Sequence, residues 1–570
     1  MTTYIYNKVK ESMRGVLLLS LGAVVLTGCS DFLDILPMDQ VVLENYWKEK
    51  ADVTSAVNGC YEALADEAVV TRMGVWGEMR SENVLDGSVP PNDIREILRE
   101  NLMPSNSMCN WASFYNVINR CNIVIHYAPE VEAYDANYTY EELQSTIAEM
   151  TTLRALCYFY LIRTFRDVPY TTAPSIDDNQ NYILPATPFE DVLDSLINDL
   201  ENVKDKAIRR YDVEKVQGKR VYVPIENNSR VTRSAIYALL ADLDLWKGDW
   251  DRVIENCDKV IEYKKELYKE LLQKDQLNDV ALYDDQIPLI LEAELGSQTV
   301  GNAYTEIFGS KNSFESLFEI YYNGNSNQEN NWVSKYYGSS SNHNGYLRAA
   351  DCLTDGFTLD QNQIFESQKD CRYYENVENE GTSYSIAKFV RTNTSFSLQR
   401  LGSVSVTSSR RATKNANWII YRLSDVLLMK AEALIERSDD DFAEAFQLIN
   451  TVYKRANGIG PDDSGTGLSY EKYSASRSQM EDLLFAERQR EFLFEGKRWY
   501  DLVRASRRDG ETTRLASCAI RKYRQDINVI KIKLADPNYI YFPYAKSELK
   551  ANPLLKQNPA FNKGEDSELK

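Results

Sequence analysis

The chain contains 570 residues and carries a formal net charge of −20, because 85 acidic residues outnumber 65 basic ones. Such an acidic protein repels nucleic-acid phosphates and anionic lipid head groups, since binding to either depends on lysine and arginine. These numbers argue against nucleic-acid partners and against electrostatic membrane binding. The length allows several domains of about 150 residues each. No linker rich in proline, glycine or serine divides the sequence, however, which favours one large unit.

The N-terminus resembles a bacterial lipoprotein signal. Three basic residues precede an apolar run at 16–26: Lys8, Lys10 and Arg14. The run is too short to cross a bilayer, which takes about 20 apolar residues in a helix. It ends in the sequence LTGC, similar to the pattern at which lipoproteins are cleaved and lipidated on the cysteine sulfur. We therefore predict a signal peptide at 1–28 and a lipid anchor at Cys29.

Two alternatives stay open in this region. Cys29 could be a free, buried cysteine that happens to follow a signal sequence, and translation could begin at Met13, which would give a more compact signal. The choice of start does not affect the rest of the chain.

The remaining cysteines and the histidines argue against several kinds of chemistry. Eight further cysteines are scattered without a C-x-x-C pair, so they form neither a zinc pattern nor a disulfide framework, and we expect most to be free and buried. His126 and His343 are the only histidines, and neither lies in a nucleophile motif. Nucleotide-binding glycine motifs are also absent. We predict no catalytic residue, no metal ligand and no cofactor, although a structural calcium stays open despite the absence of an EF-hand loop.

Apolar residues with helical spacing recur along the chain. The segment 153–164 presents one apolar face. Residues 233–263 are predicted to form two helices with a break at 247–249, and residues 421–458 two more around a turn at 438–441. Small residues at the expected crossings would let the paired helices approach closely. The pattern predicts a mostly α-helical protein built from helix pairs of tetratricopeptide (TPR) character.

Blocks spread over nearly the whole length resemble the SusD/RagB family of outer-membrane glycan-binding lipoproteins. They are CSDFLDILP, WASFYNVINRCN, LRALCYFYLIRTFRDVPY, RVTRSAIYALLADLDLWKGDW, WIIYRLSDVLLMKAEAL, INTVYKRA, ERQREFLFEGKRWYDLVR and YFPYAKSELKANPLLKQNP, in the order of the family. The chain departs from the family at Arg166, where glycine is usual, and nothing recognisable matches 270–313. The resemblance implies one SusD-like domain at 29–570, with four TPR-like helix pairs as a scaffold, long ligand-binding loops and a few short strands.

The same resemblance implies a function. The protein would capture a polysaccharide or oligosaccharide without cleaving it and deliver it to a TonB-dependent outer-membrane transporter of the SusC type. It would contact the membrane through its lipid anchor alone and face the cell exterior. Asp31 and Asp34, close behind the anchor, resemble the export pattern of surface-exposed lipoproteins, and retention facing the periplasm stays open.

The best candidate for a sugar-binding segment is residues 321–346. It contains six aromatic residues and seven asparagines but few aliphatic ones. Sugars bind to flat aromatic rings flanked by amides or carboxylates that read the hydroxyl groups. We predict platforms and hydroxyl readers here: Trp332, Tyr336 and Tyr337 as platforms, with Asn330 and Asn331 as readers. The alternative is an exposed loop whose tyrosines cover the scaffold or touch the transporter.

A second segment, GVWGEMRSEN at 74–83, could supply the other wall of the site. Within it, Trp76 and Arg80 are the candidate ligand-binding residues.

The block ERQREFLFEGKRWYDLVR also allows an enzymatic hypothesis. Glu487, Glu491 and Glu495 are spaced at four residues, which on one helix would place neighbouring carboxylates about 5 Å apart, as in retaining glycosidases. Four basic residues lie among them: Arg488, Arg490, Lys497 and Arg498. A general acid needs a carboxyl whose pKa is raised, whereas adjacent cations keep carboxylates ionised. We favour a structural ion-pair lattice, and keep a surface glycosidase and a scaffold that binds only a protein as alternative functions.

Overall fold

The computed structural model describes residues 46–562 apart from short internal segments. These segments are 177–181, 212–213, 217–218, 275–276, 278, 296–297, 327, 341–342, 355–363, 366–368, 380–382, 399–403 and 462–466. Glu49–Lys570 form one compact unit and Met1–Lys48 a separate one, so Cys29 and the predicted signal peptide lie outside the described residues. Within the described residues, no helix combines the length and apolarity needed to span a membrane.

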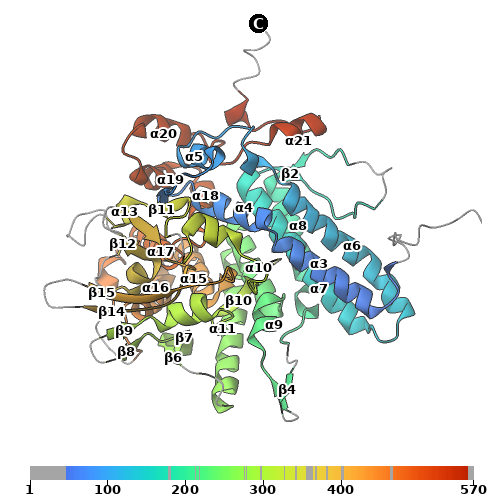
Figure 1. The fold of residues 1–570 in the computed structure, drawn as a ribbon, viewed down its shortest axis with the longest axis horizontal. Helices are drawn as coiled ribbons and strands as arrows, with labels where there is room; N and C mark the ends of the chain where they lie inside the picture. Colours follow the sequence, from blue (N-terminus) through green and yellow to red (C-terminus); the bar gives the residue numbers. More distant parts are fainter. Residues whose placement is uncertain are drawn as a thin grey trace, which may run out of the picture. The chain divides into compact units, whose positions relative to one another are not determined.

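Long helices that follow one another in sequence pack together. The helices α6 and α7 run side by side with α3 along them, and α11 packs against both α10 and α15 (Figure 1). Their bounds are α3 Lys50–Leu64, α6 Ala112–Tyr134, α7 Tyr140–Phe165, α10 Arg233–Lys247, α11 Trp250–Gln273, α15 Leu423–Arg437 and α16 Phe442–Ala456. The predicted helical segments are confirmed, and the description of the pairs as TPR-like stays a prediction.

Local sequence explains where these helices begin and end. Thr139 caps α7. Its side chain accepts a hydrogen bond from the Glu142 backbone N–H, and the Glu142 carboxylate accepts one from the Thr139 backbone N–H. The predicted break after α10 lies at Gly248, whose φ of +81° suits glycine, and Asp249 then caps α11. Arg166, which ends α7, has a φ of +71°. A residue without Cβ adopts such a positive φ without strain, so this backbone would suit the glycine that the family resemblance leads us to expect here.

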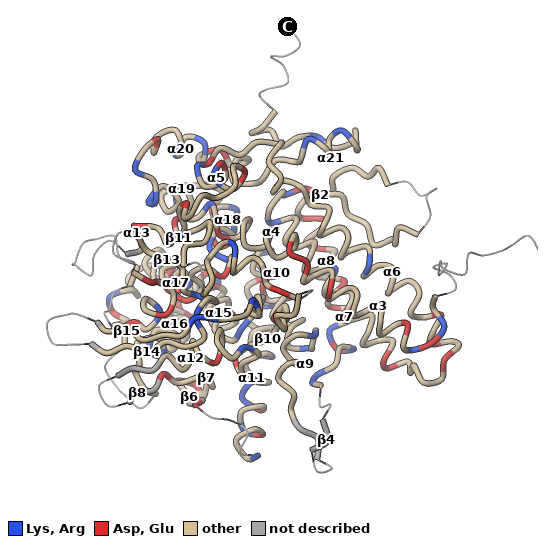
Figure 2. Tube along the Cα trace, in the orientation of Figure 1, with Lys and Arg blue, Asp and Glu red and all other residues tan. Residues whose placement is uncertain are grey.

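The remaining helices complete the unit. They are α4 Glu67–Glu78, α5 Asn92–Leu98, α8 Phe189–Val203, α9 Pro224–Ser229, α12 Asn302–Tyr304, α13 Asp351–Thr354, α14 Cys371–Asn376, α17 Arg477–Glu491, α18 Arg498–Asp509, α19 Thr513–Ala519, α20 Ile527–Leu534 and α21 Lys546–Ala551. Acidic and basic residues are interspersed along the described chain (Figure 2).

The strands are short, as predicted, and their pairings in the described residues are antiparallel. Four of them form a sheet in the order β15-β14-β9-β8, with bounds Val404–Arg410, Arg391–Leu398, Gln298–Val300 and Ala293–Leu295. The others pair two by two: β1 Val84–Asp86 with β11 Leu347–Ala349, β2 Val168–Pro169 with β3 Ala186–Thr187, β4 Glu214–Val216 with β5 Lys219–Val221, β6 Val280–Tyr283 with β7 Ile287–Ile290, β10 Ser316–Ile320 with β16 Trp418–Arg422, and β12 Val377–Asn379 with β13 Tyr384–Ile386. The segment 270–313, which matched nothing in the sequence, therefore supplies β6 to β9.

The charged block is not one continuous helix. The helix α17 ends at Glu491, and α18 begins at Arg498. Between them the chain turns through Phe494 and Gly496, whose φ values are +65° and +71°. The expectation that Glu495 continues a helical row of carboxylates is therefore wrong. The turn packs closely on α4, because a Cβ at Gly77 would lie 1.8 Å from the Gly496 carbonyl oxygen.

Candidate ligand cleft

The three predicted aromatic platforms lie in the core. Trp332, Tyr336 and Tyr337 are 1%, 6% and 0% exposed. The Trp332 ring stacks on Tyr336 with a centroid distance of 4.1 Å and lies so close to α4 that a Cβ at Gly74 would be 2.3 Å from it. The Tyr337 hydroxyl donates to the Phe494 carbonyl at 2.8 Å. A sugar cannot stack on rings that protein atoms already cover, so the structure corrects this expectation.

The second predicted wall is also buried. Trp76 stacks on Phe114 at 4.9 Å between ring centroids, and its indole N–H donates to the Met108 carbonyl at 2.9 Å. Arg80 is 0% exposed and forms a salt bridge of 2.7 Å with Glu100. Both side chains therefore pack within the fold, and neither is exposed to solvent, where it could contact a ligand.

The two predicted asparagines differ in their surroundings. Asn330 is buried: its amide donates to the Ala416 carbonyl at 2.9 Å, and its oxygen accepts from the Val333 backbone at 3.2 Å. Asn331 is half-buried, and its oxygen accepts from the Lys414 ammonium at 3.0 Å. Of the seven predicted ligand-binding residues, Asn331 is the one whose side chain is partly open to solvent while it lines a surface cleft.

This cleft has a volume of about 380 Å³, within the usual range for small-ligand sites. Its walls are the helical turn Val333–Tyr337, the residues 338–340 that follow it, and the segment 411–416 between β15 and β16. Each of these segments contributes polar side chains to the cleft, and Val333, Val390 and Ala416 supply apolar surface. The polar lining residues are Asn330, Asn331, Ser334, Lys335, Ser339, Ser340, Arg411, Thr413 and Lys414. We name it the polar cleft.

The cationic groups of the polar cleft already have partners. Lys414 forms a salt bridge of 2.8 Å with Glu329, and Lys335 pairs with Glu67. The Arg411 guanidinium donates to the carbonyls of Phe389 and Phe308, and its burial lowers its pKa. The cleft therefore offers amide and hydroxyl groups to a ligand more readily than free positive charge, which suits the neutral hydroxyl groups of a sugar.

A second cleft, of about 320 Å³, lies between Arg209, Arg210 and the helix α11. Tyr263 lines it, with the Arg209 guanidinium 5.7 Å from the ring centroid. Arg210 forms a salt bridge of 2.6 Å with Glu270. Hydrogen bonds from Arg210 and Lys274 lower the pKa of Glu270 to about 2. Sequence reasoning missed this cleft, because its residues come from segments that carry no shared motif.

The comparisons with known proteins agree with the fold. Residues 299–561 match the model of the SusD family. This chain is 24% identical to SusD-like protein P38 of Formosa agariphila over 507 residues, which cover 87% of this chain and 91% of P38. SusD-like protein P25 of the same organism is also 24% identical, over 94% of this chain and 96% of its own length. A crystal structure of a SusD homolog from Bacteroides thetaiotaomicron covers 91% of this chain and 98% of the homolog, with a TM-score of 0.66 at 17% identity. The chain is similar to SusD-family proteins.

The predicted resemblance and the mostly helical SusD-like fold are thus confirmed. The matched region 299–561 contains the whole polar cleft of this SusD-like chain.

The charged block of the SusD-like chain forms a buried ion-pair lattice. Glu487 pairs with Arg490 at 2.8 Å, but most partners come from outside the block. Glu491 pairs with Arg422 and Arg455, and Glu495 with Lys388 and Arg422, at 2.5 to 2.8 Å. Burial alone would raise the pKa of Glu491, but the guanidinium groups of Arg455, Arg422 and Arg372 hold it well below its usual range. An ionised carboxylate cannot act as a general acid, so the lattice hypothesis fits these residues better than the glycosidase hypothesis.

Two kinds of buried carboxyl predict how stability depends on pH. Burial raises the pKa of Glu78 to about 7, so its protonated form favours the folded state, and stability falls as pH rises from about 4.3 to 7. The pKa of Glu491 is depressed in the folded state. Its ionised form therefore stabilises the fold above about pH 4.3, and this stability is lost as the pH falls through the folded-state pKa. We expect the free energy of unfolding, measured by urea denaturation, to peak in mildly acidic buffer.

The variant Glu78→Gln tests the alkaline side of this profile. Because the amide does not titrate, the free energy of unfolding should decline less steeply between about pH 4.3 and 7. Its dependence on pH at more acidic values should stay the same. An unchanged profile would contradict the assignment to Glu78.

Proposed function

We propose that this chain captures a polysaccharide or oligosaccharide without cleaving it and delivers it to a TonB-dependent outer-membrane transporter of the SusC type. The observation that carries the proposal is the SusD-family match over 299–561, the region that holds the polar cleft. The ionised, ion-paired state of Glu491 supports a binding function over hydrolysis.

The proposal includes a lipid anchor at Cys29 and exposure at the cell surface. The apolar run at 16–26 and the LTGC sequence that follows it support the anchor. Metabolic labelling with a fatty-acid analogue should mark the full-length protein and leave the Cys29→Ser variant unlabelled.

We propose the polar cleft as the glycan site. Asn331 and Thr413, from two separate segments, line it with an amide and a hydroxyl group, and both side chains are at least partly exposed. These groups can accept and donate hydrogen bonds to sugar hydroxyls. The segment 321–346 thus keeps its proposed role, but through polar side chains beside the cleft instead of through its buried aromatic rings.

The test is native affinity electrophoresis of the unlipidated protein, residues 30–570, through gels that contain plant, host and microbial polysaccharides. We expect retardation by one polysaccharide class and no new reducing ends in a parallel assay. The double variant Asn331→Ala/Thr413→Ala should weaken binding about tenfold, since each lost hydrogen bond contributes about 0.5–1.5 kcal/mol.

Tyr263→Ala in the second cleft is the matched control. Retained binding in Tyr263→Ala with weakened binding in the double variant assigns the site to the polar cleft. The reverse result assigns it to the second cleft. Unretarded migration in every gel, together with binding to the transporter, would support a scaffold that binds only a protein.

A further inference from the structure

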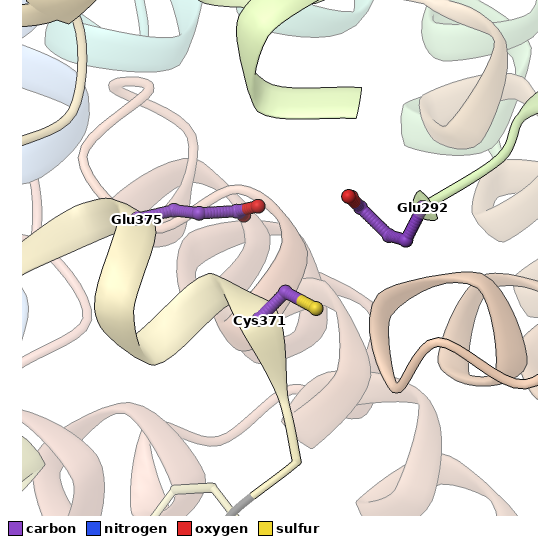
Figure 3. A group of neighbouring side chains, drawn as sticks. All are labelled: Glu292, Cys371 and Glu375. Atoms are coloured by element: carbon purple, nitrogen blue, oxygen red, sulfur yellow. The ribbon is translucent and has the colours of Figure 1, made fainter. Parts of the chain in front are cut away.

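Three buried side chains converge beside the segment that follows β7. Glu292 follows β7, while Cys371 and Glu375 lie four residues apart and therefore on one face of α14. Figure 3 shows the three side chains directed toward one another, with Glu292 opposite the helix. A carboxylate oxygen of each glutamate and the cysteine sulfur all lie within 4.8 Å of one another. The three residues are 6%, 0% and 5% exposed, in chain order.

One carboxylate oxygen of each glutamate in this cluster is buried without a hydrogen-bond donor in the described part of the chain. Oε2 of Glu292 and Oε1 of Glu375 make no hydrogen bond among the residues that the structure describes. An unsatisfied buried polar atom costs about 1–3 kcal/mol, and more if it is charged. Four cationic side chains line the adjoining cavity: Arg372, Lys388, Arg422 and Arg455. Each forms ion pairs with other carboxylates, as Arg455 does with Glu491 at 2.5 Å and with Glu315 at 3.4 Å. Among the described residues, the two acids and the thiol therefore share a space in which each neighbouring cation is paired with another carboxylate.

The cluster matches the preferences of one class of cation. Zinc accepts sulfur and carboxylate oxygen together and takes four ligands, whereas calcium and magnesium prefer oxygen alone. Tetrahedral bonds of about 2.0–2.3 Å place ligand atoms roughly 3.5 Å apart, so the three side chains need to close by about 1 Å. The adjoining cavity of about 20 Å³, which Glu292 and Glu375 line together with those four ion-paired cations, has room for one water as the fourth ligand.

We propose that Glu292, Cys371 and Glu375 bind one structural zinc ion, with a water completing the coordination. The ion replaces protons: binding releases the thiol proton of Cys371 and any proton held between the two carboxyl groups. Its role is to fasten α14 to the segment after β7. That segment lies outside the family match, which begins at residue 299, whereas α14 lies inside it. The site is independent of the proposed glycan function.

The alternative occupant is a proton. Burial, and after it the Glu375 carboxylate, raises the pKa of Glu292 well above its usual range, and burial raises the pKa of Glu375 to about 7. A shared proton would satisfy the pair without a metal, and it predicts no response to zinc.

The experiment uses the full chain, stripped with a chelator and then titrated with zinc chloride or cobalt(II) chloride. We expect one zinc per chain by mass spectrometry of the metal content, a higher melting temperature with zinc, and a thiolate-to-cobalt charge-transfer band with cobalt. The Cys371→Ser variant should lose the band. Cys157→Ser replaces an equally buried cysteine that lies outside the cluster, and it should keep both the metal and the band.

The variant Glu375→Gln keeps the side-chain shape and so covers the case in which Cys371→Ser does not fold. It should bind zinc at least about tenfold more weakly than the wild type, because a neutral amide is a poor zinc ligand. Wild-type protein that retains no stoichiometric zinc, or that shows no thiolate band with cobalt, would overturn the proposal in favour of the shared proton.

Discussion

Replacing Glu491 with glutamine is expected to lower the free energy of unfolding by about 3–5 kcal/mol, because it removes one side of a buried ion-pair cluster. Arg422, Arg455 and Arg372 would lose a shared counter-ion within the core, where water cannot solvate them. Urea denaturation followed by tryptophan fluorescence measures the change.

Arg437→Ala is the control for a surface ion pair. Arg437 pairs with Asp441 at 2.7 Å, but both groups are partly exposed, so the loss should be about 0–1 kcal/mol. The surface-glycosidase hypothesis predicts a different outcome: Glu491→Gln would leave stability unchanged and abolish the release of reducing ends. Stability that matches the wild type would therefore contradict the lattice assignment.

Replacing Trp332 with alanine is expected to destabilise the protein by about 3–5 kcal/mol, since it leaves a large cavity in the core. The ring stacks on Tyr336, meets Trp418 edge-on at 6.1 Å between ring centroids and fills the space beside Gly74. Thermal and urea denaturation measure the loss.

Tyr134→Ala removes an aromatic side chain that is 80% exposed and should change stability by no more than about 0.5 kcal/mol. If Trp332 were a ligand platform, its variant would instead lose glycan affinity and keep wild-type stability. The two measurements on the two variants separate these roles.

The helices could be predicted because their signals are local. The spacing of apolar residues in α7, the glycine after α10 and the turn after α15 lie within a few residues of the structures that they determine. The family blocks supplied the rest of the fold.

The site could not be predicted in the same way, because burial is decided by distant segments. Trp332 is buried since Gly74, far away in the sequence, leaves room for its ring. An aromatic and asparagine-rich composition is equally consistent with an exposed loop and with a packed one. Likewise the partners of Glu491 and Glu495 come from four other segments, whereas the sequence offered the neighbouring Arg488 and Lys497.

The buried charges near α4 also constrain the order of events during biosynthesis. The Arg80 guanidinium donates to the carbonyls of Tyr539 and Ile540, and Glu82 pairs with Arg498 at 2.7 Å. A growing chain can pair Arg80 with Glu100 early, but Glu82 and the remaining donors of Arg80 lack their final partners until most of the sequence has been made. Contacts of such long range form slowly and leave partly folded states open to aggregation. The N-terminal helices should consequently depend on the last helices of the chain to reach their native packing.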